Sequence, residues 1–327
     1  MKAIVYTKYG PPEVLQLGEV EKPTPNDDQV LVKVHAVSIN PADWHTRRGM
    51  LLARLMAGSG LLRPKYPIIG ADFSGRVEAV GKNVAQFKPG DEVFGRKSPG
   101  GFAEYVCVSE KPIALKPANS TFEQAAGVPV AAMTALQALR DVGGIQSGQK
   151  VLVNGASGGV GTFTVQIAKA FGAEVTGVCS TQNLDLVRSI GADRVIDYTN
   201  EDFTTTGQQY DLIVDNVGNR LASDLARVLS PTGICVGAGF GGVTRMVQNA
   251  FLQRSISRTS GKRFGGLMAR INNQDLALLK ELMEAGKVVT VIDRCYPLGE
   301  VPEAFRYAEQ GHARVKVIIT LDPKRNI

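Results

Sequence analysis

The stretch QKVLVNGASGGVG, residues 149–161, decides the fold, because it has the pattern of a strand, a glycine-rich turn and the start of a helix. Val151 to Val153 are apolar and mostly β-branched, as is typical of a parallel strand buried on both faces. Gly155 allows a tight turn, Gly158 allows backbone N–H groups to approach phosphate oxygens, and Gly161 allows the helix to pack closely on the strand. The stretch therefore predicts a turn that binds a pyrophosphate.

The residues after this turn continue the pattern of a βαβ unit. Phe163, Ile167 and Phe171 recur at helical spacing and give the helix one apolar face toward a sheet. A second strand pattern follows at 174–179 and completes the βαβ unit. Because the helix begins at the glycine turn, its positive N-terminal end faces the predicted ligand. Because Ala156 stands where a glycine is usual, this context supports the prediction more than the glycine spacing does. A glycine-rich turn that binds no nucleotide is the competing interpretation.

The end of the second strand bears on which dinucleotide binds. An NAD-selective site commonly places Asp or Glu there to bond the ribose 2′-OH, whereas residues 179–183 of this chain read CSTQN. A carboxylate would repel a 2′-phosphate, while hydroxyls, amides and the helix N-terminus near Thr181 are able to bond one. The sequence therefore favours NADPH over NADH.

The composition predicts two domains of a soluble globular protein. The chain has 327 residues, of which 44% are hydrophobic and 21% are charged, and this length is enough for about two cores. Its formal net charge is +6, with lysine and arginine scattered along the sequence. We therefore expect anionic ligands such as NADPH, and we do not expect a nucleic acid partner.

The N-terminus and the cysteines both indicate a reducing compartment. The sequence enters an apolar strand pattern at 3–7, so we expect no signal peptide, and no apolar run approaches the roughly 18 residues of a membrane span. The four cysteines are far apart and lie in or beside apolar runs, which is typical of buried thiols without a disulfide or metal pattern. The predicted location is cytoplasmic.

Two patterns of elements divide the chain. Residues 1–120 show short strands punctuated by Gly and Pro, which predicts a small β-barrel-like domain that 265–327 completes. Residues 121–264 alternate helix and strand patterns, which predicts an inserted domain with a doubly wound parallel sheet. The overall class is α/β. The predicted strands are 3–7, 15–20, 29–39, 72–80, 92–94, 103–108, 150–154, 174–179, 194–197, 211–215, 234–237 and 315–321, the last returning to the first domain, and the predicted helices include 122–128, 130–141, 274–285 and 301–310.

Seven short motifs follow one another along almost the whole chain. They are SINPAD (38–43), IGADFSGRV (69–77), KPGDEV (88–93), AMTA (132–135), the glycine turn (155–161), GAD (191–193) and DNVG (215–218). In this order they resemble the zinc-independent quinone oxidoreductase branch of the medium-chain dehydrogenase/reductase superfamily, which includes zeta-crystallin. The resemblance implies a GroES-like catalytic domain with an inserted Rossmann cofactor domain.

The resemblance also implies that no metal is needed. Zinc-dependent members of the superfamily carry Cys where Asn40 stands and His-Glu where Ala71 and Asp72 stand. Asn40 and Ala71 supply neither the thiolate nor the imidazole that catalytic zinc prefers. We therefore expect no metal site.

Carried over by position, the resemblance implies a set of cofactor contacts. The glycine turn lies against the pyrophosphate, Asn216 and Val217 lie along the adenosine ribose, and Gly239 approaches the nicotinamide half. Ser180 and Tyr198 match positions that contact the 2′-phosphate in NADPH-using relatives. The residues assigned to NADPH are Thr134, Gly155, Ser157, Gly158, Gly159, Val160, Gly161, Ser180, Thr181, Asn183, Tyr198, Asn216, Val217 and Gly239.

The simplest metal-free reaction is hydride transfer from the nicotinamide to the β-carbon of an α,β-unsaturated carbonyl, or to a quinone. His45 is the candidate proton donor, because it follows Asn40 and Asp43 on a turn that faces the cofactor in relatives, and histidine titrates near neutral pH. Solvent is the alternative donor. Asn40 is a candidate for bonding the substrate carbonyl or the nicotinamide ribose. Asp43 is a candidate for a ligand contact or for holding the turn through backbone N–H groups.

Residues 50–62 form an apolar insertion beside this turn, and three interpretations stay open. The insertion is a lid over a lipophilic pocket, a peripheral membrane contact through 50–65, or a core helix against the barrel. The expected substrate is a small lipophilic carbonyl compound or quinone. By analogy with relatives, a homodimer is a further expectation.

Two other functions compete with this one. A 2-enoyl-thioester reductase would need a basic surface for a nucleotide-bearing carrier such as coenzyme A. A non-catalytic protein that binds NADPH and acts as a redox-sensing or RNA-binding partner is the third hypothesis, and the basic composition gives it limited support.

Overall fold

The computed structural model describes residues 1–51, 54, 60, 62–239, 243–310 and 315–321, and the chain forms two compact units. Unit 1 comprises Met1–Ala131, Ile271–Gly286 and Thr290–Ile327, and unit 2 comprises Ala132–Arg270 and Lys287–Val289. The first division falls later than the predicted boundary at 120, because helix α3 (Phe122–Ala126) packs against strands of unit 1. The second division follows Arg270 rather than residue 264.

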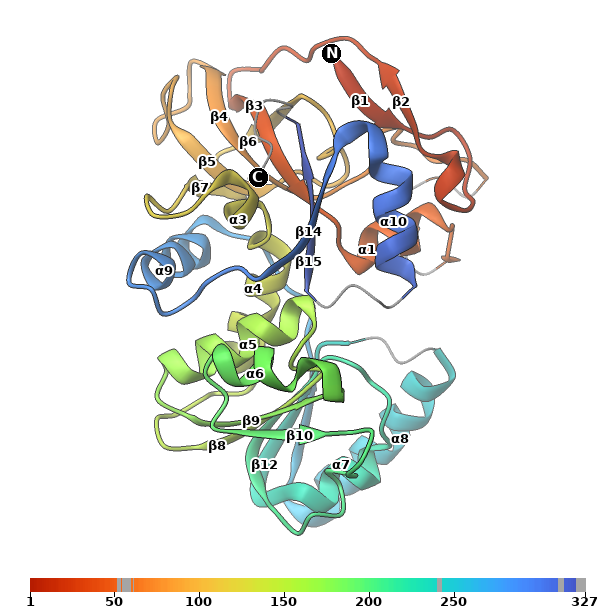
Figure 1. The fold of residues 1–327 in the computed structure, drawn as a ribbon, viewed down its shortest axis with the longest axis vertical. Coiled ribbons are helices and arrows are strands. Elements are labelled where there is room, and N and C mark those ends of the chain that lie inside the picture. The colour runs from red at the N-terminus through yellow and green to blue at the C-terminus, as the bar shows by residue number, and fades with distance from the viewer. Residues whose placement is uncertain (52–53, 55–59, 61, 240–242, 311–314, 322–327) are drawn as a thin grey trace. The chain divides into compact units, whose positions relative to one another are not determined.

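Unit 1 is built on a sheet with the strand order β14-β15-β3-β4-β5-β7, in which β6 pairs with β3 (Figure 1). The long strand β3 pairs antiparallel with β15, β4 and β6. As predicted, strand β15 returns from the C-terminal part of the chain to the first domain. There it pairs with β3, with Ile318 opposite Ser38. The strands are β1 (Lys2–Val5), β2 (Gln16–Glu19), β3 (Gln29–Ser38), β4 (Asp72–Val80), β5 (Glu92–Arg96), β6 (Tyr105–Ser109), β7 (Ile113–Leu115), β14 (Ile292–Pro297) and β15 (Lys316–Thr320).

Buried β-branched and aromatic side chains form the core of unit 1. Val32 and Phe73, on β3 and β4, are fully buried in it. Helix α10 (Val301–Glu309) covers this core with Val301, Ala304 and Phe305, whose spacing places them on one helical face. The described residues of this unit also form the α-helices α1 (Pro41–Arg47), α3 and α9 (Asn273–Glu284).

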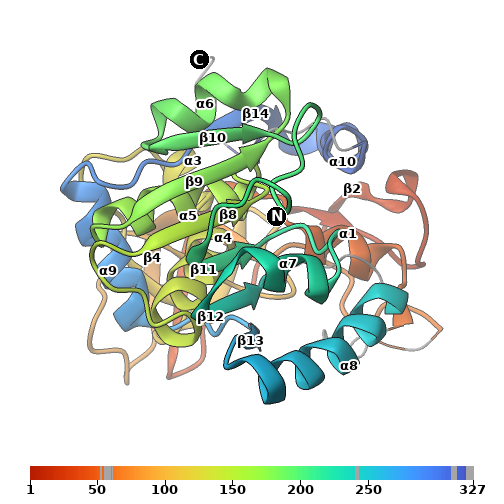
Figure 2. The same ribbon diagram turned by 90° about the horizontal axis from the view of Figure 1, so that it is seen from below.

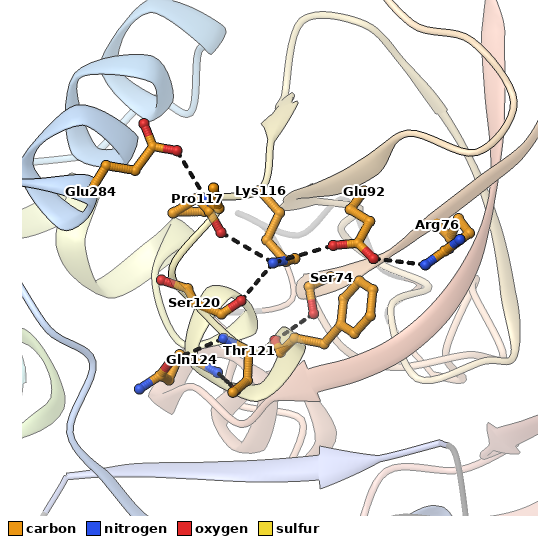
Figure 3. Close-up of polar contacts among 11 residues, drawn as sticks. Ser74, Arg76, Glu92, Lys116, Pro117, Ser120, Thr121, Gln124 and Glu284 are labelled. Atoms are coloured by element: carbon orange, nitrogen blue, oxygen red, sulfur yellow. Dashed lines mark hydrogen bonds and ion pairs between the residues drawn. The ribbon is translucent and has the colours of Figure 1, made fainter.

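A polar network fixes the segment between β7 and α3 to the sheet (Figure 3). The Lys116 ammonium donates to the carbonyl oxygens of Pro117 at 3.1 Å and Ser120 at 2.5 Å, and lies 3.3 Å from Glu92 Oε2. The same Glu92 pairs with Arg76 at 2.8 Å. A capping box begins α3. The charge of Lys116 is therefore compensated within the protein.

Unit 2 contains a parallel sheet with the order β10-β9-β8-β11-β12-β13. The chain moves outward from β8 to β10, then returns to β11 and moves outward the other way. Since parallel crossovers are right-handed, α5 and α6 lie on one face, and α7 and α8 lie on the other, where they pack side by side (Figure 2). The order reverses between β8 and β11, and ligands bind at the carboxyl ends of strands at such a point.

The elements of unit 2 match the sequence pattern where strands are buried on both faces. The predicted bounds of β8, β9 and β10 coincide with the observed ones, as do those of β4 in unit 1. Strands β7, β13 and β14 were not predicted, and neither was α8, whose apolar residues do not gather on one side. The elements are α4 (Pro129–Gln137, which contains the division), β8 (Lys150–Asn154), α5 (Gly159–Ala170), β9 (Glu174–Cys179), α6 (Leu184–Ser189), β10 (Arg194–Asp197), β11 (Tyr210–Asp215), α7 (Ala222–Val228), β12 (Leu229–Gly237), α8 (Val243–Ser260) and β13 (Arg263–Gly266).

The helices formed by the described residues include none that is long and apolar enough to cross a membrane.

Candidate functional site

The carboxyl end of β8 leads into the predicted pyrophosphate turn. Gly155 has a φ of +78°, in the left-handed region that residues with a side chain rarely adopt. A Cβ on Gly161 would lie 2.0 Å from the Gly155 carbonyl oxygen, so the close approach of helix and strand requires glycine. The N–H groups of Gly155 and Ala156 donate to the Val178 carbonyl oxygen and hold the turn against β9.

The turn sets the N-terminus of α5 at the point where the strand order reverses. Gly158 is the N-cap, and a Cβ there would meet a single backbone oxygen, at 3.4 Å. Gly159, Val160 and Gly161 form the first turn of α5, where helical N–H groups have no intrahelical acceptor. Ser157 lies half-buried beside them. This open cradle of N–H groups fits a pyrophosphate.

Asp215, at the end of β11, holds the loops at the same edge of the sheet. Its Oδ1 accepts from Asn154 Nδ2 at 2.8 Å and from the N–H groups of Val217 at 3.1 Å and Gly218 at 2.9 Å. Its carbonyl oxygen accepts from the N–H of Gly239 at 3.1 Å. One buried residue thus joins the ends of β8, β11 and β12. The DNVG motif is a landmark in the sequence, but its pattern alone indicates no role for Asp215.

Asn216 carries the unpaired polar groups of this edge. Both polar atoms of its side chain are buried and have no hydrogen-bond partner among the described residues. Gly239 lies so close that a Cβ there would be 2.1 Å from the Asn216 carbonyl oxygen. Val217 is exposed beside it. Since a buried amide without a partner costs free energy, Asn216 fits the predicted contact with a ribose hydroxyl.

The ends of β9 and β10 contain the residues predicted to distinguish NADPH from NADH. Asn183 Nδ2 donates to Ser180 Oγ at 3.0 Å, and Tyr198 is exposed. Thr181 Oγ1 donates to Asp197 Oδ2 at 2.6 Å. The structure thus brings a carboxylate to a place where the sequence showed no acid, because Asp197 arrives from the neighbouring strand. The hydrogen bond from Thr181 is the largest cause that lowers the pKa of Asp197, so this carboxylate is ionised at neutral pH.

All of the residues predicted to contact the cofactor lie in unit 2, with Thr134 half-buried on α4. The glycine turn, the N-terminus of α5 and the Asn216 amide meet at one edge of one sheet. Their geometry fits a dinucleotide, with its pyrophosphate on α5 and a ribose near Asn216.

The predicted catalytic residues begin helix α1 in unit 1. The N–H of Asn40 donates to Asp43 Oδ2 at 2.8 Å, and the N–H of Asp43 donates to the Asn40 carbonyl oxygen at 2.9 Å. Asp43 is buried and holds the turn through these bonds, one of its two predicted roles. His45 is half-buried, and its Nδ1 has no hydrogen-bond partner among the described residues. Burial, and then the charge of Arg48, lower the pKa of His45, so the imidazole is neutral at pH 7.

Asn40 belongs to a buried polar cluster, here called the Lys316 cluster, which consists of Asn40, Asp43, Asp72 and Lys316. Asn40 Nδ2 donates to Asp72 Oδ2 at 3.0 Å, and the Lys316 ammonium donates to Asn40 Oδ1 at 2.8 Å. All four side chains are at most 6% exposed. Both ends of the Asn40 amide are therefore bonded within the protein, so a bond from Asn40 to a substrate carbonyl would require a contact in the cluster to break.

Burial sets the ionisation of the Lys316 cluster. It raises the pKa of Asp43 to about 7, a shift that the N–H of Asn40 opposes and the charge of Asp72 increases. Burial also raises the pKa of Asp72 and lowers that of Lys316. The ammonium and the two carboxyl groups offset one another's burial cost.

The donor set of this cluster does not suit zinc. It offers carboxylates, an amide and an ammonium ion rather than thiolate or imidazole. Among the residues that the structure describes, no three His, Cys, Asp or Glu side chains gather where they could hold a metal ion. Cys107, Cys179 and Cys235 are buried, as expected, whereas Cys295 on β14 is exposed. The expectation that every cysteine is buried was therefore wrong for Cys295.

Most of the insertion 50–62 falls outside the described residues, so its three interpretations stay predictions. The structure also adds three residues that sequence reasoning missed: Asp197, Asp215 and Lys316.

Comparison with known proteins identifies the family. A model described as a zinc-binding dehydrogenase matches residues 190–319, and one described as an alcohol dehydrogenase GroES-like domain matches residues 26–118. The chain is 34% identical to the chloroplastic quinone-oxidoreductase QR1 of Triphysaria versicolor, over 98% of each chain. It is 38% identical to the chloroplastic NADPH-dependent alkenal/one oxidoreductase of Arabidopsis thaliana, over 98% of this chain and 79% of that protein.

Solved structures agree with this result. The quinone oxidoreductase from Coxiella burnetii superimposes with a TM-score of 0.85 and 32% identity, over 98% of this chain and 99% of that one. The predicted α/β architecture, a GroES-like domain with a Rossmann domain, is confirmed. The chain therefore belongs to the quinone oxidoreductase branch of the medium-chain dehydrogenase/reductase superfamily and is an NAD(P)H-dependent oxidoreductase.

Proposed function

We propose that this protein uses NADPH to reduce quinones or the C=C bond of α,β-unsaturated carbonyl compounds, without a metal ion. The observation that carries the proposal is the Lys316 ammonium bonded to Asn40, the position where zinc-dependent members of the superfamily place a zinc ligand. The substrate class is supported by relatives, one named as a quinone oxidoreductase and one as an alkenal/one oxidoreductase.

When bound, the nicotinamide supplies a hydride to an electron-poor carbon of the substrate. The protein's part is binding and orientation. The first turn of α5 binds the pyrophosphate, and the unpaired Asn216 amide bonds a ribose hydroxyl. Asp215 keeps Asn216 and Gly239 at the same edge through its own hydrogen bonds.

Hydride addition to the β-carbon leaves an enolate, which takes up a proton at the α-carbon or the oxygen. His45 is the proposed donor, because its ring is half-buried and its Nδ1 has no hydrogen-bond partner among the described residues. The imidazolium form gives the proton, which leaves a neutral imidazole that regains a proton from solvent. Because the pKa of His45 is lowered, the imidazolium is the minor form at pH 7, so this role predicts a rate that falls as pH rises. Proton delivery by solvent alone is the alternative that the variant below tests.

The preference for NADPH is part of the proposal. The Ser180 hydroxyl and the exposed Tyr198 phenol are the groups that would bond a 2′-phosphate. The ionised Asp197 opposes it by repulsion, and Thr181 is already bonded to Asp197. The expected preference is therefore smaller than a cationic site would give.

The test is steady-state oxidation of NADPH and of NADH with a panel of enones, quinones and 2-enoyl thioesters. We expect turnover with enones or quinones, a lower KM for NADPH than for NADH, and no loss of rate after dialysis against a chelator. NADPH binding without turnover of any panel member would refute the proposal and favour the non-catalytic hypothesis. Turnover of thioesters alone would favour the thioester reductase.

The role of His45 has its own control. His45→Ala removes the donor, whereas His45→Gln keeps a side-chain N–H that can hydrogen-bond but cannot give up its proton. We expect kcat for enones to fall by about tenfold or more in both variants, because general acid catalysis contributes at least that much. An unchanged kcat and pH profile in His45→Ala would assign the proton to solvent.

A further inference from the structure

Unit 1 contains a pocket of about 390 Å³ at the end of β5. Its polar lining consists of Gln29, Arg96, Lys97, Ser98 and Ser109, and its remaining lining is apolar. The volume is in the range of small-molecule sites. Two cations and no acid face this space, so it is electropositive.

The two cations are not neutralised at short range. Arg96 Nε is buried and has no hydrogen-bond partner among the described residues. Within those residues, neither Arg96 nor Lys97 has an acidic group within ion-pair distance. Lys116, which follows the neighbouring strand β7, differs from Arg96 and Lys97 in this respect. Its charge is compensated by Glu92 and by two carbonyl oxygens (Figure 3). Because Arg96 lines the pocket and no acid among the described residues neutralises it at short range, its charge is available to a ligand.

Two acids of the Lys316 cluster interact electrostatically with Arg96. Asp72 stands opposite Arg96 in the register of β4 and β5, and the charge of Arg96 lowers the pKa of both Asp72 and Asp43. The Lys316 charge acts on the same two carboxyl groups. Two cations, Arg96 and Lys316, thus act on the two carboxyl groups, and Lys97 adds a further positive charge to the pocket lining.

We propose that this pocket binds an oxyanion of the substrate, either a carboxylate or a phosphate group. A guanidinium bonds such a group through two parallel N–H donors, and Lys97 adds a charge that needs no fixed geometry. The Ser98 and Ser109 hydroxyls and the Gln29 amide complete a set of donors. That the oxyanion belongs to the substrate rests on the proposed function, whereas the affinity of the pocket for oxyanions does not.

Hydrogen bonds connect the pocket to helix α1, which contains the proposed proton donor. The N–H of Lys97 donates to the Ala71 carbonyl oxygen at 2.7 Å, and Ala71 precedes Asp72 of the Lys316 cluster. Asn40 of the same cluster is the N-cap of α1, which carries His45. An oxyanion held by Arg96 would therefore be fixed relative to His45 within one unit.

Binding is tested by calorimetric titration of the full chain with succinate and with inorganic phosphate, at constant ionic strength, using neutral succinamide as the matched compound. We expect succinate or phosphate to bind and succinamide not to bind. Arg96→Gln and Lys97→Gln should each weaken binding about tenfold or more, since each removes a charged hydrogen-bond donor. Lys88→Gln removes the same charge from an exposed turn of unit 1 and should bind as the wild type does.

Arg96→Lys is the second variant. It keeps the positive charge beside Asp72 but loses the two parallel N–H donors of the guanidinium. Its affinity should lie between those of the wild type and Arg96→Gln. Thermal unfolding of each variant identifies any that fails to fold. Absence of binding by both probes in the wild type, or equal affinity in the wild type and both glutamine variants, would overturn the proposal. Stronger binding of phosphate than of succinate would identify the oxyanion as a phosphate, and the reverse as a carboxylate.

The kinetic readout compares an enone that ends in a carboxylate with its methyl ester. The ratio of kcat/KM for acid over ester should exceed one in the wild type and fall about tenfold or more in Arg96→Gln. If the probes bind and the glutamine variants do not, but no enone or quinone is reduced, the pocket stands and the proposed function fails. If enones are reduced with an acid-to-ester ratio that Arg96→Gln leaves unchanged, the oxyanion does not belong to the substrate.

Discussion

Lys316→Met removes a buried ammonium ion while keeping most of the side-chain volume. In the wild type this ammonium donates to Asn40 Oδ1 at 2.8 Å and lies among the carboxyl groups of Asp43 and Asp72. The variant leaves the amide oxygen without its donor and both carboxyl groups without their cation. Breaking a buried ion pair by removing one partner costs about 3–5 kcal/mol.

This cost is a large part of the roughly 5–15 kcal/mol that stabilises a domain. For a unit of this size, each kcal/mol lowers Tm by roughly 2–4 °C, so we expect a fall of about 6–20 °C. The loss depends on pH in a defined direction. Because the folded pKa of Asp43 is about 7, above its ordinary value of 3.8, its contribution to stability is complete at acid pH and is lost as pH rises through 7.

Removing Lys316 raises the folded pKa of Asp43 and Asp72 further, so the variant should be more destabilised at pH 8 than at pH 5, where both carboxyl groups take up protons. The assay is urea unfolding at both pH values, followed by the fluorescence of Trp44. This residue is the single tryptophan of the chain and packs against the core of unit 1, so the signal reports on that unit.

Lys88→Met, on an exposed turn, is the control for loss of a lysine charge. Adding Asp72→Asn to Lys316→Met should restore part of the stability, since it removes one of the uncompensated charges. A loss below about 1 kcal/mol, or an equal loss at pH 5 and pH 8, would show that Lys316 does not compensate these acids.

Three further predictions concern the cofactor edge of unit 2. Gly161→Ala places a Cβ 2.0 Å from the Gly155 carbonyl oxygen, so the turn must move and NADPH should bind about tenfold or more weakly in a fluorescence titration. Asn216→Ala should weaken NADPH binding without lowering Tm, because the amide that it removes has no hydrogen-bond partner among the described residues; a matching fall in Tm would contradict this. Asp197→Asn removes a charge beside Thr181 and should raise the affinity for NADPH relative to NADH; an unchanged ratio would place the 2′-phosphate elsewhere.

The sequence predicted the parts of the fold that depend on local pattern. The bounds of β8 and β9 were predicted because most of their residues are buried and apolar and the chain turns polar or glycine-rich after them. The predicted bounds of β4 and β10 also coincide with the observed ones. The glycine turn was predicted because two of its glycines meet local steric requirements. Gly155 has a left-handed φ, and Gly161 leaves room for a close contact between helix and strand. Helix α8 was missed because its apolar residues follow no helical face.

The parts that were missed depend on pairing between distant strands. Asp197 reaches Thr181 through the register of β10 and β9, and Lys316 reaches Asn40 across 276 residues of sequence. No local pattern marks either contact. Asn40 was predicted to bond the substrate carbonyl or the nicotinamide ribose, and this stays a prediction. Its bonds to Asp72 and Lys316 could not be predicted for the same reason.

The interior position of β15 has a consequence for biosynthesis. This strand lies between β14 and β3, yet a ribosome makes it after every other strand of the same sheet. The residues of unit 2, apart from the short segment 287–289, are complete well before that point, so unit 2 can fold while translation continues. Until β15 emerges, the edge of β3 that it will cover is open to other extended chains, and a chaperone that shields strand edges would act there.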